Sequence, residues 1–180
     1  MTTMNRVRGL LLAGSLLVGV LATVGTAWAG YITCTVGVGC FGTSGTDELQ
    51  GTAKGDSIFG LNGNDTLLGG RGGDFLIGDA LSDFGADGND LIYGGPGNDE
   101  LIGGGGSDLL KGGAGNDLIY ANSDKLASDQ DTVLAGKGDD TIQADDGYKD
   151  DINCGSGKDE VWFDQNIDQV AANCEKQHPV

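Results

Sequence analysis

The sequence predicts an all-β fold, a solenoid of parallel strands to which each nine-residue unit contributes one strand. Within the 180 residues, the chain repeats itself every nine residues from 42 to 171, as in GLNGNDTLL, GGRGGDFLI, GGPGNDELI and GGAGNDLIY. Glycine occupies positions 1, 2 or 4 of the unit, aspartate position 6 and a branched aliphatic residue position 8. A period this short is typical of solenoids, in which stacked units share one core.

Position 8 supplies the predicted core. It is apolar in every unit: Leu49, Ile58, Leu67, Leu76, Ile92, Leu101, Leu110, Ile119, Val133, Ile142, Ile152, Val161 and Val170. Each unit is therefore expected to form a glycine-rich turn of six residues and a three-residue strand whose middle side chain points inward. Two units would make one coil, and coils would stack about 4.8 Å apart as a parallel β-roll or β-helix. No helical period of 3.6 residues is present, and glycine disfavours helices.

The repeat is interrupted twice, and its last third is irregular. Insertions are predicted at 78–84 and 121–125, and an extra residue, Ala144, disturbs the period after them. Weaker repeats are expected at the end of a solenoid because the last coil must be capped. We therefore expect an N-terminal cap over 30–41, the repeats over 42–171 and a C-terminal tail over 172–180.

Residues 1–29 have the pattern of a cleavable export signal. Arg6 and Arg8 precede an uncharged, mostly apolar stretch over 10–24, and Ala27-Trp28-Ala29 offers a small-x-small cleavage site before Gly30. A membrane anchor is the alternative, since 9–29 is long enough to span a bilayer. No basic stop-transfer cluster follows, so we predict a secreted, extracellular protein without membrane contact after cleavage.

The composition is acidic and rich in glycine. The formal net charge is -17, which disfavours nucleic acid and anionic lipid as partners and favours divalent cations. The 35 glycines would suggest a flexible linker if they were unpatterned. They keep a fixed phase with the aspartates, and this phase favours an ordered metal-binding turn instead.

Calcium suits such turns better than other metals do. It takes six to eight oxygen ligands from carboxylates and main-chain carbonyls, and glycine permits the turn geometry that aims carbonyls inward. Position-6 aspartates two units apart would lie on the same side of the stack and could hold an ion between them. Magnesium demands near-ideal octahedral geometry, and transition metals prefer imidazole or thiolate, which these turns lack.

The units resemble the RTX, or haemolysin-type, calcium-binding repeats, and the resemblance covers most of the chain after residue 29. It implies a parallel β-roll with calcium between adjacent turns and the position-6 aspartates as ligands: Asp65, Asp74, Asp90, Asp99, Asp108, Asp117 and Asp140, with Asp47, Asp56 and Asp159 as further candidates. Asp131, Asp150 and Asp168 lie in glycine-poor units, so we expect only structural roles for them. The N-terminal signal and the lack of a passenger domain resemble the small, free-standing secreted members of the family.

Four cysteines in an exported chain predict disulfides. Three pairings are possible, and we favour Cys34 with Cys40 and Cys154 with Cys174 because these pairs lie at opposite ends of the repeats. A zinc site is the alternative. It is disfavoured because neither pair has C-x-x-C spacing and the only histidine, His178, lies in the predicted tail.

No residue pattern indicates catalysis. No serine lies near a histidine and an acid in the sequence, and carboxylate pairs such as Asp139–Asp140 are better explained by metal binding or a solvated face. Gly103–Gly106 lacks the lysine and helix of a phosphate-binding loop. We therefore predict a protein that is not an enzyme, binds several calcium ions and folds on binding them, since the core is small and stacking brings carboxylates together.

Three alternatives remain open. The chain could be an extracellular adhesion or interaction module with structural calcium, contacting a glycan or protein through the aromatic residues Phe59, Tyr93, Tyr120 and Trp162 at position 9. It could be a carbohydrate-active β-helix enzyme, for which only the two insertions could supply a groove. An ice-binding solenoid is disfavoured because it needs a regular threonine array, whereas position 7 offers the scattered Thr66, Thr132 and Thr141.

Overall fold

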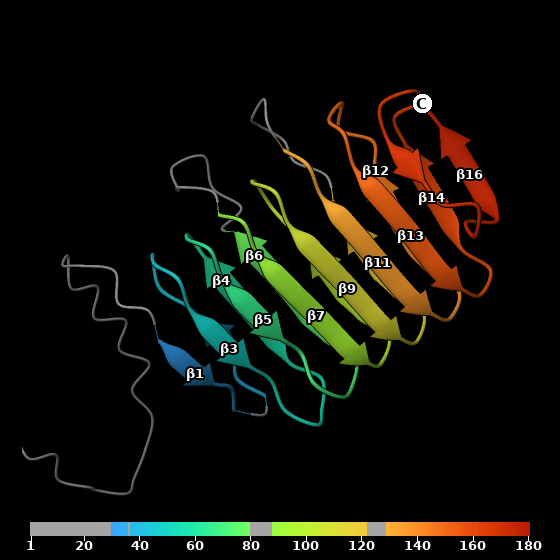
Figure 1. Ribbon diagram of the computed structural model, residues 1–180. Coiled ribbons are helices and arrows are strands. Elements are labelled where there is room, and N and C mark those ends of the chain that lie inside the picture. Colours follow the sequence, from blue (N-terminus) through green and yellow to red (C-terminus); the bar gives the residue numbers. More distant parts are fainter. Residues whose placement is uncertain (1–29, 36, 80–87, 122–128) are drawn as a thin grey trace, which may run out of the picture.

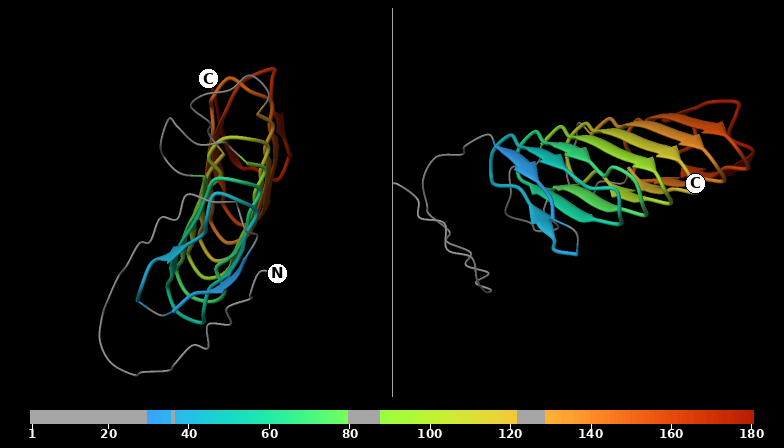
Figure 2. Two further views of the ribbon diagram at one scale, coloured as in Figure 1. Left: turned by 90° about the vertical axis from the view of Figure 1, so that its left-hand side faces the viewer. Right: turned by 90° about the horizontal axis from the view of Figure 1, so that it is seen from below.

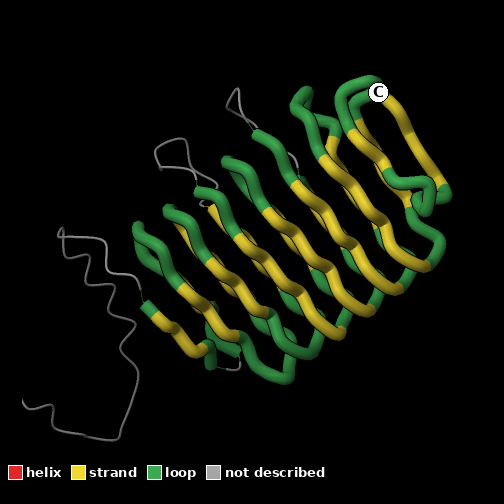
Figure 3. Tube along the Cα trace, viewed as in Figure 1, coloured by secondary structure: helices red, strands yellow, loops and turns green. Residues whose placement is uncertain are grey.

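A computed structural model of the protein describes residues 30–35, 37–79, 88–121 and 129–180. These residues form a β-solenoid of two facing parallel sheets with eight strands each and no helix (Figures 1 and 3). The predicted fold class is confirmed. No helix in the described part of the chain is long and apolar enough to cross a membrane. The predicted export signal, 1–29, lies outside the described residues.

Successive strands alternate between the two sheets, so each coil of the solenoid contributes one strand to each. The odd sheet contains β1 (Tyr31–Thr33), β3 (Glu48–Gln50), β5 (Thr66–Leu68), β7 (Leu91–Pro96), β9 (Leu109–Ala114), β11 (Thr132–Lys137), β13 (Asp151–Ser156) and β15 (Gln169–Val170). The even sheet contains β2 (Cys40–Phe41), β4 (Ser57–Leu61), β6 (Phe75–Asp79), β8 (Glu100–Ile102), β10 (Leu118–Tyr120), β12 (Thr141–Ala144), β14 (Glu160–Phe163) and β16 (Lys176–Pro179). Figure 2 shows the sheets as the two long walls of the stack.

The core consists of the position-8 side chains, which meet between the sheets. Strand register aligns them in one row per sheet; in the odd sheet, for example, Leu67 pairs with Ile92 and Ile92 with Leu110. These side chains are buried, except that Val170 in the last coil of the odd sheet is partly exposed. One aliphatic side chain per strand therefore supplies most of the apolar core, as the repeat predicts.

The solenoid extends into the segments flanking the repeats. Residues 30–41 contribute β1 and β2, and 172–180 contribute β16, which pairs with β14. In β16, His178 stacks on Trp162 with ring centroids 4.6 Å apart, and its Nε2 lies 2.7 Å from Oε1 of Glu160. The hydrogen bond from His178 lowers the pKa of Glu160. The C-terminal segment is thus built into the even sheet.

The described residues include only the first residues of the two predicted insertions. Strand β6 includes Gly78 and Asp79, the first two residues of the segment 78–84, and Ala121 of the segment 121–125 is buried and bonds through its N–H to the carbonyl of Gln143. The remaining predicted positions, 80–84 and 122–125, lie outside the described residues. In the chain, the segments 80–87 and 122–128 lie between β6 and β7 and between β10 and β11, so each comes after a strand of the even sheet and before one of the odd sheet.

Two disulfides close the ends of the stack. They join Cys34 to Cys40 and Cys154 to Cys174, each with its Cα atoms 5.3 Å apart. The favoured pairing is confirmed, and it leaves no thiolate among these four cysteines for a zinc site.

Candidate metal centre

The position-6 aspartates form two columns, one along each edge of the solenoid. The odd column contains the aspartates in turns that lead into the odd sheet: Asp47, Asp65, Asp90, Asp108, Asp131, Asp150 and Asp168. The even column contains Asp56, Asp74, Asp99, Asp117, Asp140 and Asp159. All except Asp168 are buried, with exposed fractions of 0 to 6%. Every predicted ligand is therefore aligned with others of its kind, and none points freely into solvent.

One oxygen of each carboxylate except that of Asp56 accepts an N–H from the preceding coil. Oδ1 of Asp65 accepts the N–H of Asp47 at 2.7 Å, and Oδ1 of Asp74 accepts the N–H of Asp56 at 2.8 Å. The pattern continues to Asp168 in the odd column. In the even column it ends at Glu175, whose Oε2 accepts the N–H of Asp159. Because this oxygen is fixed, the second oxygen is held in a constant place relative to the turn.

The second oxygen is where a cation would bind. Oδ2 is buried without a hydrogen-bond donor in Asp65, Asp74, Asp90, Asp99, Asp117, Asp131, Asp140, Asp150 and Asp159. A buried acceptor left without a partner costs about 1–3 kcal/mol, and more if it is charged. A row of such oxygens on adjacent coils needs positive charge, and a hard cation supplies it without requiring a hydrogen-bond donor.

Glycine at position 1 brings a main-chain carbonyl to the same place. A Cβ added to Gly60 would lie 2.6 Å from Oδ2 of Asp65 and 2.6 Å from the carbonyl oxygen of Gly78 in the next coil. In the even column, a Cβ on Gly69 would lie 2.5 Å from Oδ2 of Asp74 and 2.6 Å from the carbonyl oxygen of Gly94. A carboxylate oxygen and a carbonyl oxygen thus converge above each of these glycines, and any side chain there would fill the space between them.

This donor set fits calcium. Among the described residues, no three Asp, Glu, His or Cys side chains converge on one point, so main-chain carbonyls or water must complete any coordination shell. Calcium accepts such mixed oxygen shells of six to eight ligands, whereas zinc and other transition metals prefer nitrogen or sulfur.

Comparison with known proteins agrees with this chemistry. A family model, the RTX calcium-binding nonapeptide repeat, matches in four copies, at residues 41–76, 84–119, 102–124 and 127–161. The matched segments cover more than half of the chain. The chain belongs to this RTX repeat family. Searches of curated proteins and of solved structures found no match.

The first coil differs from the later RTX coils because it supplies its own donors. Oδ2 of Asp47 accepts the N–H and hydroxyl of Thr43 at 2.6 and 2.7 Å, and Oδ2 of Asp56 accepts those of Thr52 at 2.6 and 2.8 Å. Oδ1 of Asp56 remains buried without a donor. Of the ligand candidates implied by the resemblance, Asp47 is therefore the one whose oxygens are best satisfied by the protein.

Burial opposes ionisation along both columns. It raises the pKa of Asp65, Asp74 and Asp140 to about 6, and that of Asp117 to about 7. In the odd column, burial and then repulsion by neighbouring aspartates raise the pKa of Asp90 and Asp150 to about 8 and that of Asp131 to about 9. Backbone hydrogen bonds offset only part of each rise. At neutral pH, ionisation of Asp90, Asp131 and Asp150 is therefore unfavourable without a bound cation.

Two features of these RTX turns were not expected from the sequence. Asp131 and Asp150, for which we expected structural roles only, have the same fixed Oδ1 and the same unsatisfied, buried Oδ2 as the aspartates of glycine-rich turns. Position 5 forms a second, outer ladder; Oδ1 of Asn98, for example, accepts the N–H of Asn116 at 2.9 Å. The recurring GND triplet was the available signal for this ladder.

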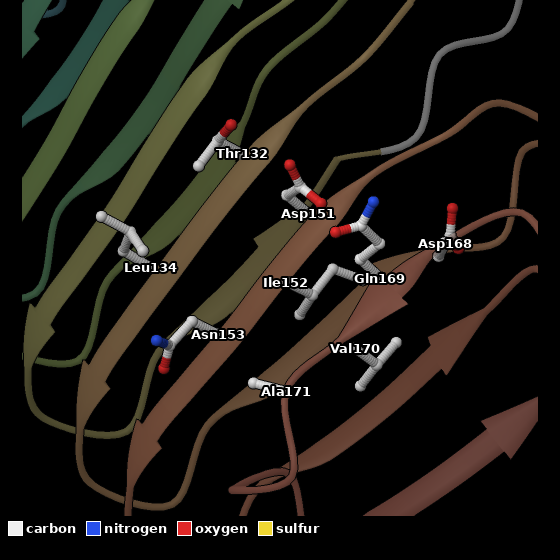
Figure 4. A pocket seen from close by; sticks show the side chains of 9 residues that line it. All are labelled: Thr132, Leu134, Asp151, Ile152, Asn153, Asp168, Gln169, Val170 and Ala171. Atoms are coloured by element: carbon white, nitrogen blue, oxygen red, sulfur yellow. The ribbon is translucent and has the colours of Figure 1, made fainter.

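The outer surface of the odd sheet carries a depression of about 580 Å³ over β11, β13 and β15 (Figure 4). Two aspartates line it. Asp151 is exposed beside Lys149, with Nζ and Oδ1 3.8 Å apart, and Asp168 accepts main-chain N–H groups of Asp150 and Asp164 with its two oxygens. Partial burial raises the pKa of Asp168, but both of its oxygens are already hydrogen-bonded, and Asp151 is exposed to solvent. RTX repeats are structural calcium-binding units, not catalytic ones.

The aromatic residues at position 9 do not share one surface. Phe59, Tyr120 and Trp162 lie in one row on the even sheet, whereas Tyr93 lies on the odd sheet. Phe41 extends the even row and stacks on Phe59 with ring centroids 4.9 Å apart. This row, called the aromatic row below, holds its aromatic residues with Ile77, Ile102 and Gln143 between them, and Tyr93 belongs to a different row.

Proposed function

We propose that this chain is a secreted RTX protein that folds by binding calcium between its coils. The single observation that carries the proposal is the repeated buried Oδ2 without a donor, which recurs in both columns. Without a cation, folding would bury a row of like charges that have no compensating donor. With calcium between coils, the same oxygens become ligands, and binding free energy contributes directly to folding.

The calcium sites we propose follow the columns. Their ligands are Asp65, Asp74, Asp90, Asp99, Asp108, Asp117, Asp131, Asp140, Asp150 and Asp159, each with carbonyl oxygens of neighbouring turns. Asp47 and Asp56 are the weakest members because Thr43 and Thr52 already bond to them. The turns of extracellular modules typically bind calcium with dissociation constants of about 10⁻⁴ to 10⁻³ M. Such affinity suits a chain that stays unfolded until it reaches a calcium-rich medium.

A calcium titration followed by far-ultraviolet circular dichroism tests the folding step. We expect a cooperative gain of β signal with calcium and none with magnesium at the same concentrations. A β spectrum that is the same in chelator and in calcium would refute folding on binding.

Secretion needs a separate experiment because it depends on residues 1–29. N-terminal sequencing of protein recovered from the culture medium should begin at Gly30. Recovery of the intact chain only with the cell membrane would support the anchor alternative.

An interaction module is the second candidate, and the aromatic row of the even sheet favours it. Phe41 and Phe59 stack on adjacent coils, and Tyr120 lies further along the same row, with Ile77 and Ile102 between it and Phe59. Neutral glycans stack on aromatic side chains of this kind. Sedimentation of the calcium-loaded chain with an insoluble neutral polysaccharide should decrease on changing Phe59 to Ala but not on changing Tyr93 to Ala. Equal losses, or no sedimentation of the wild type, would remove this candidate.

A further inference from the structure

The N-terminal end of the solenoid, formed by β1 and β2, is uncharged. No charged side chain occurs from Gly30 to Thr46, whereas the whole chain carries a formal net charge of -17. The first acidic residue is the buried Asp47, whose Oδ1 accepts the N–H of Gly30 at 2.9 Å. Two copies of an acidic chain repel each other over most of their surfaces, so they meet the least repulsion at their N-terminal ends.

Strand β1 is an edge strand with unpaired main-chain groups. It lies at the end of the odd sheet and pairs only with β3 among the described strands (Figure 1). The carbonyl of Gly30 and the N–H of Cys34 bond to β3, so alternate residues face that strand. The N–H and C=O groups of Tyr31 and Thr33 therefore point to the other side, where no described strand follows. Such a row of groups is a template for a further strand.

The opposite end of the solenoid is protected. In β16, alternate residues bond to β14, which leaves Gln177 and Pro179 facing outward, and proline offers no N–H. In the other sheet, beside β15, the N–H of Asp168 donates to the carbonyl of Asp164. Charged side chains and proline commonly protect an edge strand, and β1 has neither. The asymmetry favours a closed pair of copies over a head-to-tail fibre, which would need both ends to be open.

Apolar side chains at the N-terminal end are left uncovered. Tyr31 is 65% exposed and Phe41 57% exposed. Ile32 is aligned with the core residue Leu49 but is only partly buried, because no coil precedes it in the described chain. A strand added to β1 would cover Ile32 and continue the core, so the contact would bury apolar surface as well as pair main-chain groups.

We propose that two copies of the chain associate through their N-terminal ends, with β1 of one copy pairing antiparallel to β1 of the other. Antiparallel neighbours exchange N–H···O bonds in both directions, so the outward groups of Tyr31 and Thr33 are complementary to the same groups in a second copy. A two-fold axis then relates the copies, as in an isologous dimer. This association rests on the secretion and calcium-driven folding proposed above, since cleavage before Gly30 would free the edge of β1 and folding would form it.

Sedimentation of the protein recovered from the medium, in calcium and over a range of concentrations, tests this association. Thr33→Pro removes one outward N–H from each copy, and Tyr31→Glu adds a like charge to each. Matched controls make the same changes at the protected end: Gln177→Pro removes an outward N–H, and Val180→Glu replaces a side chain that is 64% exposed.

We expect the wild type and both controls to form dimers with similar dissociation constants. Thr33→Pro should raise this constant about 10- to 100-fold, because the two-fold axis doubles the loss to two hydrogen bonds per dimer. Tyr31→Glu should raise it as well, through repulsion between the two copies. Since Tyr31→Glu changes only an exposed side chain, it keeps the test valid if circular dichroism shows that Thr33→Pro does not fold.

A wild type that folds in calcium but stays monomeric would overturn the inference and leave the proposed function intact. Equal dissociation constants in variants and controls, or assemblies larger than a dimer, would also overturn it. A monomer that retains residues 1–29 would point to that segment, and not to a second copy, as the occupant of the edge. A wild type that fails to fold in calcium would overturn the proposed function and this inference with it.

Discussion

The pKa values of the odd column predict that the metal-free protein becomes less stable as the pH rises. Burial raises the pKa of Asp90 and Asp150 to about 8 and that of Asp131 to about 9, from 3.8. A carboxyl with a higher pKa in the folded chain keeps its proton there after the unfolded chain has lost it. Such a group stabilises the folded state fully below about pH 4, and this stabilisation is lost as the pH rises through the folded-state pKa.

The three carboxyls set the size of the effect. Between about pH 5 and 7, each keeps its proton in the folded chain only, and each such proton lowers the free energy of unfolding by about 1.4 kcal/mol per pH unit. The three together reach up to about 4 kcal/mol per pH unit, and a small domain has only about 5–15 kcal/mol in total. The metal-free roll is therefore expected to be folded near pH 5 and unfolded near pH 8.

Circular dichroism in chelator between pH 4 and 9 measures this slope. Acidification also relieves general repulsion in a chain of net charge -17, so two triple variants are compared. Asp90→Asn/Asp131→Asn/Asp150→Asn should flatten the pH dependence, whereas Glu48→Gln/Glu100→Gln/Asp151→Asn on the outer faces should leave it close to wild type. A metal-free protein that is more stable at pH 8 than at pH 5 would refute the argument. In calcium the dependence should reverse, because protons compete with the ion for the same oxygens.

Three further perturbations test individual contacts. Gly97→Ala places a Cβ on the carbonyl oxygen of Gly72 and should lower the free energy of unfolding by about 3 kcal/mol or more, measured by urea titration with calcium. In the control, Gly147→Ala, the added Cβ meets nothing within 4 Å, so the cost should be only about 1–2 kcal/mol, from the positive φ. Equal costs would contradict the close stacking of coils. Thr52→Val removes the hydroxyl bonded to Asp56 and should lower stability by about 1–3 kcal/mol in calcium, and no change would mean that Asp56 finds another partner. Cys154→Ser opens the C-terminal disulfide and should cost about 3 kcal/mol at saturating calcium; an unchanged thermal midpoint would show that the last coil is held without it.

Much of the architecture could be predicted because the period fixes it. An apolar residue at every position 8 requires an inward-facing strand in every unit, and two units per coil follow from the need to close a core between two sheets. The disulfide between Cys154 and Cys174 was predictable for the same reason, since two units return the chain to the same edge.

The finer features of the site could not be predicted from the motif because they depend on stacking. Asp131 and Asp150 lie in turns with little glycine, yet the strands on either side fix their place in the column and hence their burial. The bonds from Thr43 and Thr52 depend on the turn geometry, which makes a residue at position 2 reach the aspartate four residues later. The interruptions 80–87 and 122–128 both precede a strand of the odd sheet because of the number of units between them. The sequence shows this only once two units are assigned to each coil.

A crystal structure of the protein grown in calcium would test the central claim most directly. We predict ions between adjacent coils, about 2.3–2.6 Å from Oδ2 of position-6 aspartates such as Asp65, Asp99 and Asp117 and from carbonyl oxygens of the neighbouring turns. Coils stacked as described here, with these oxygens bonded to protein or water donors and no cation between the turns, would contradict it.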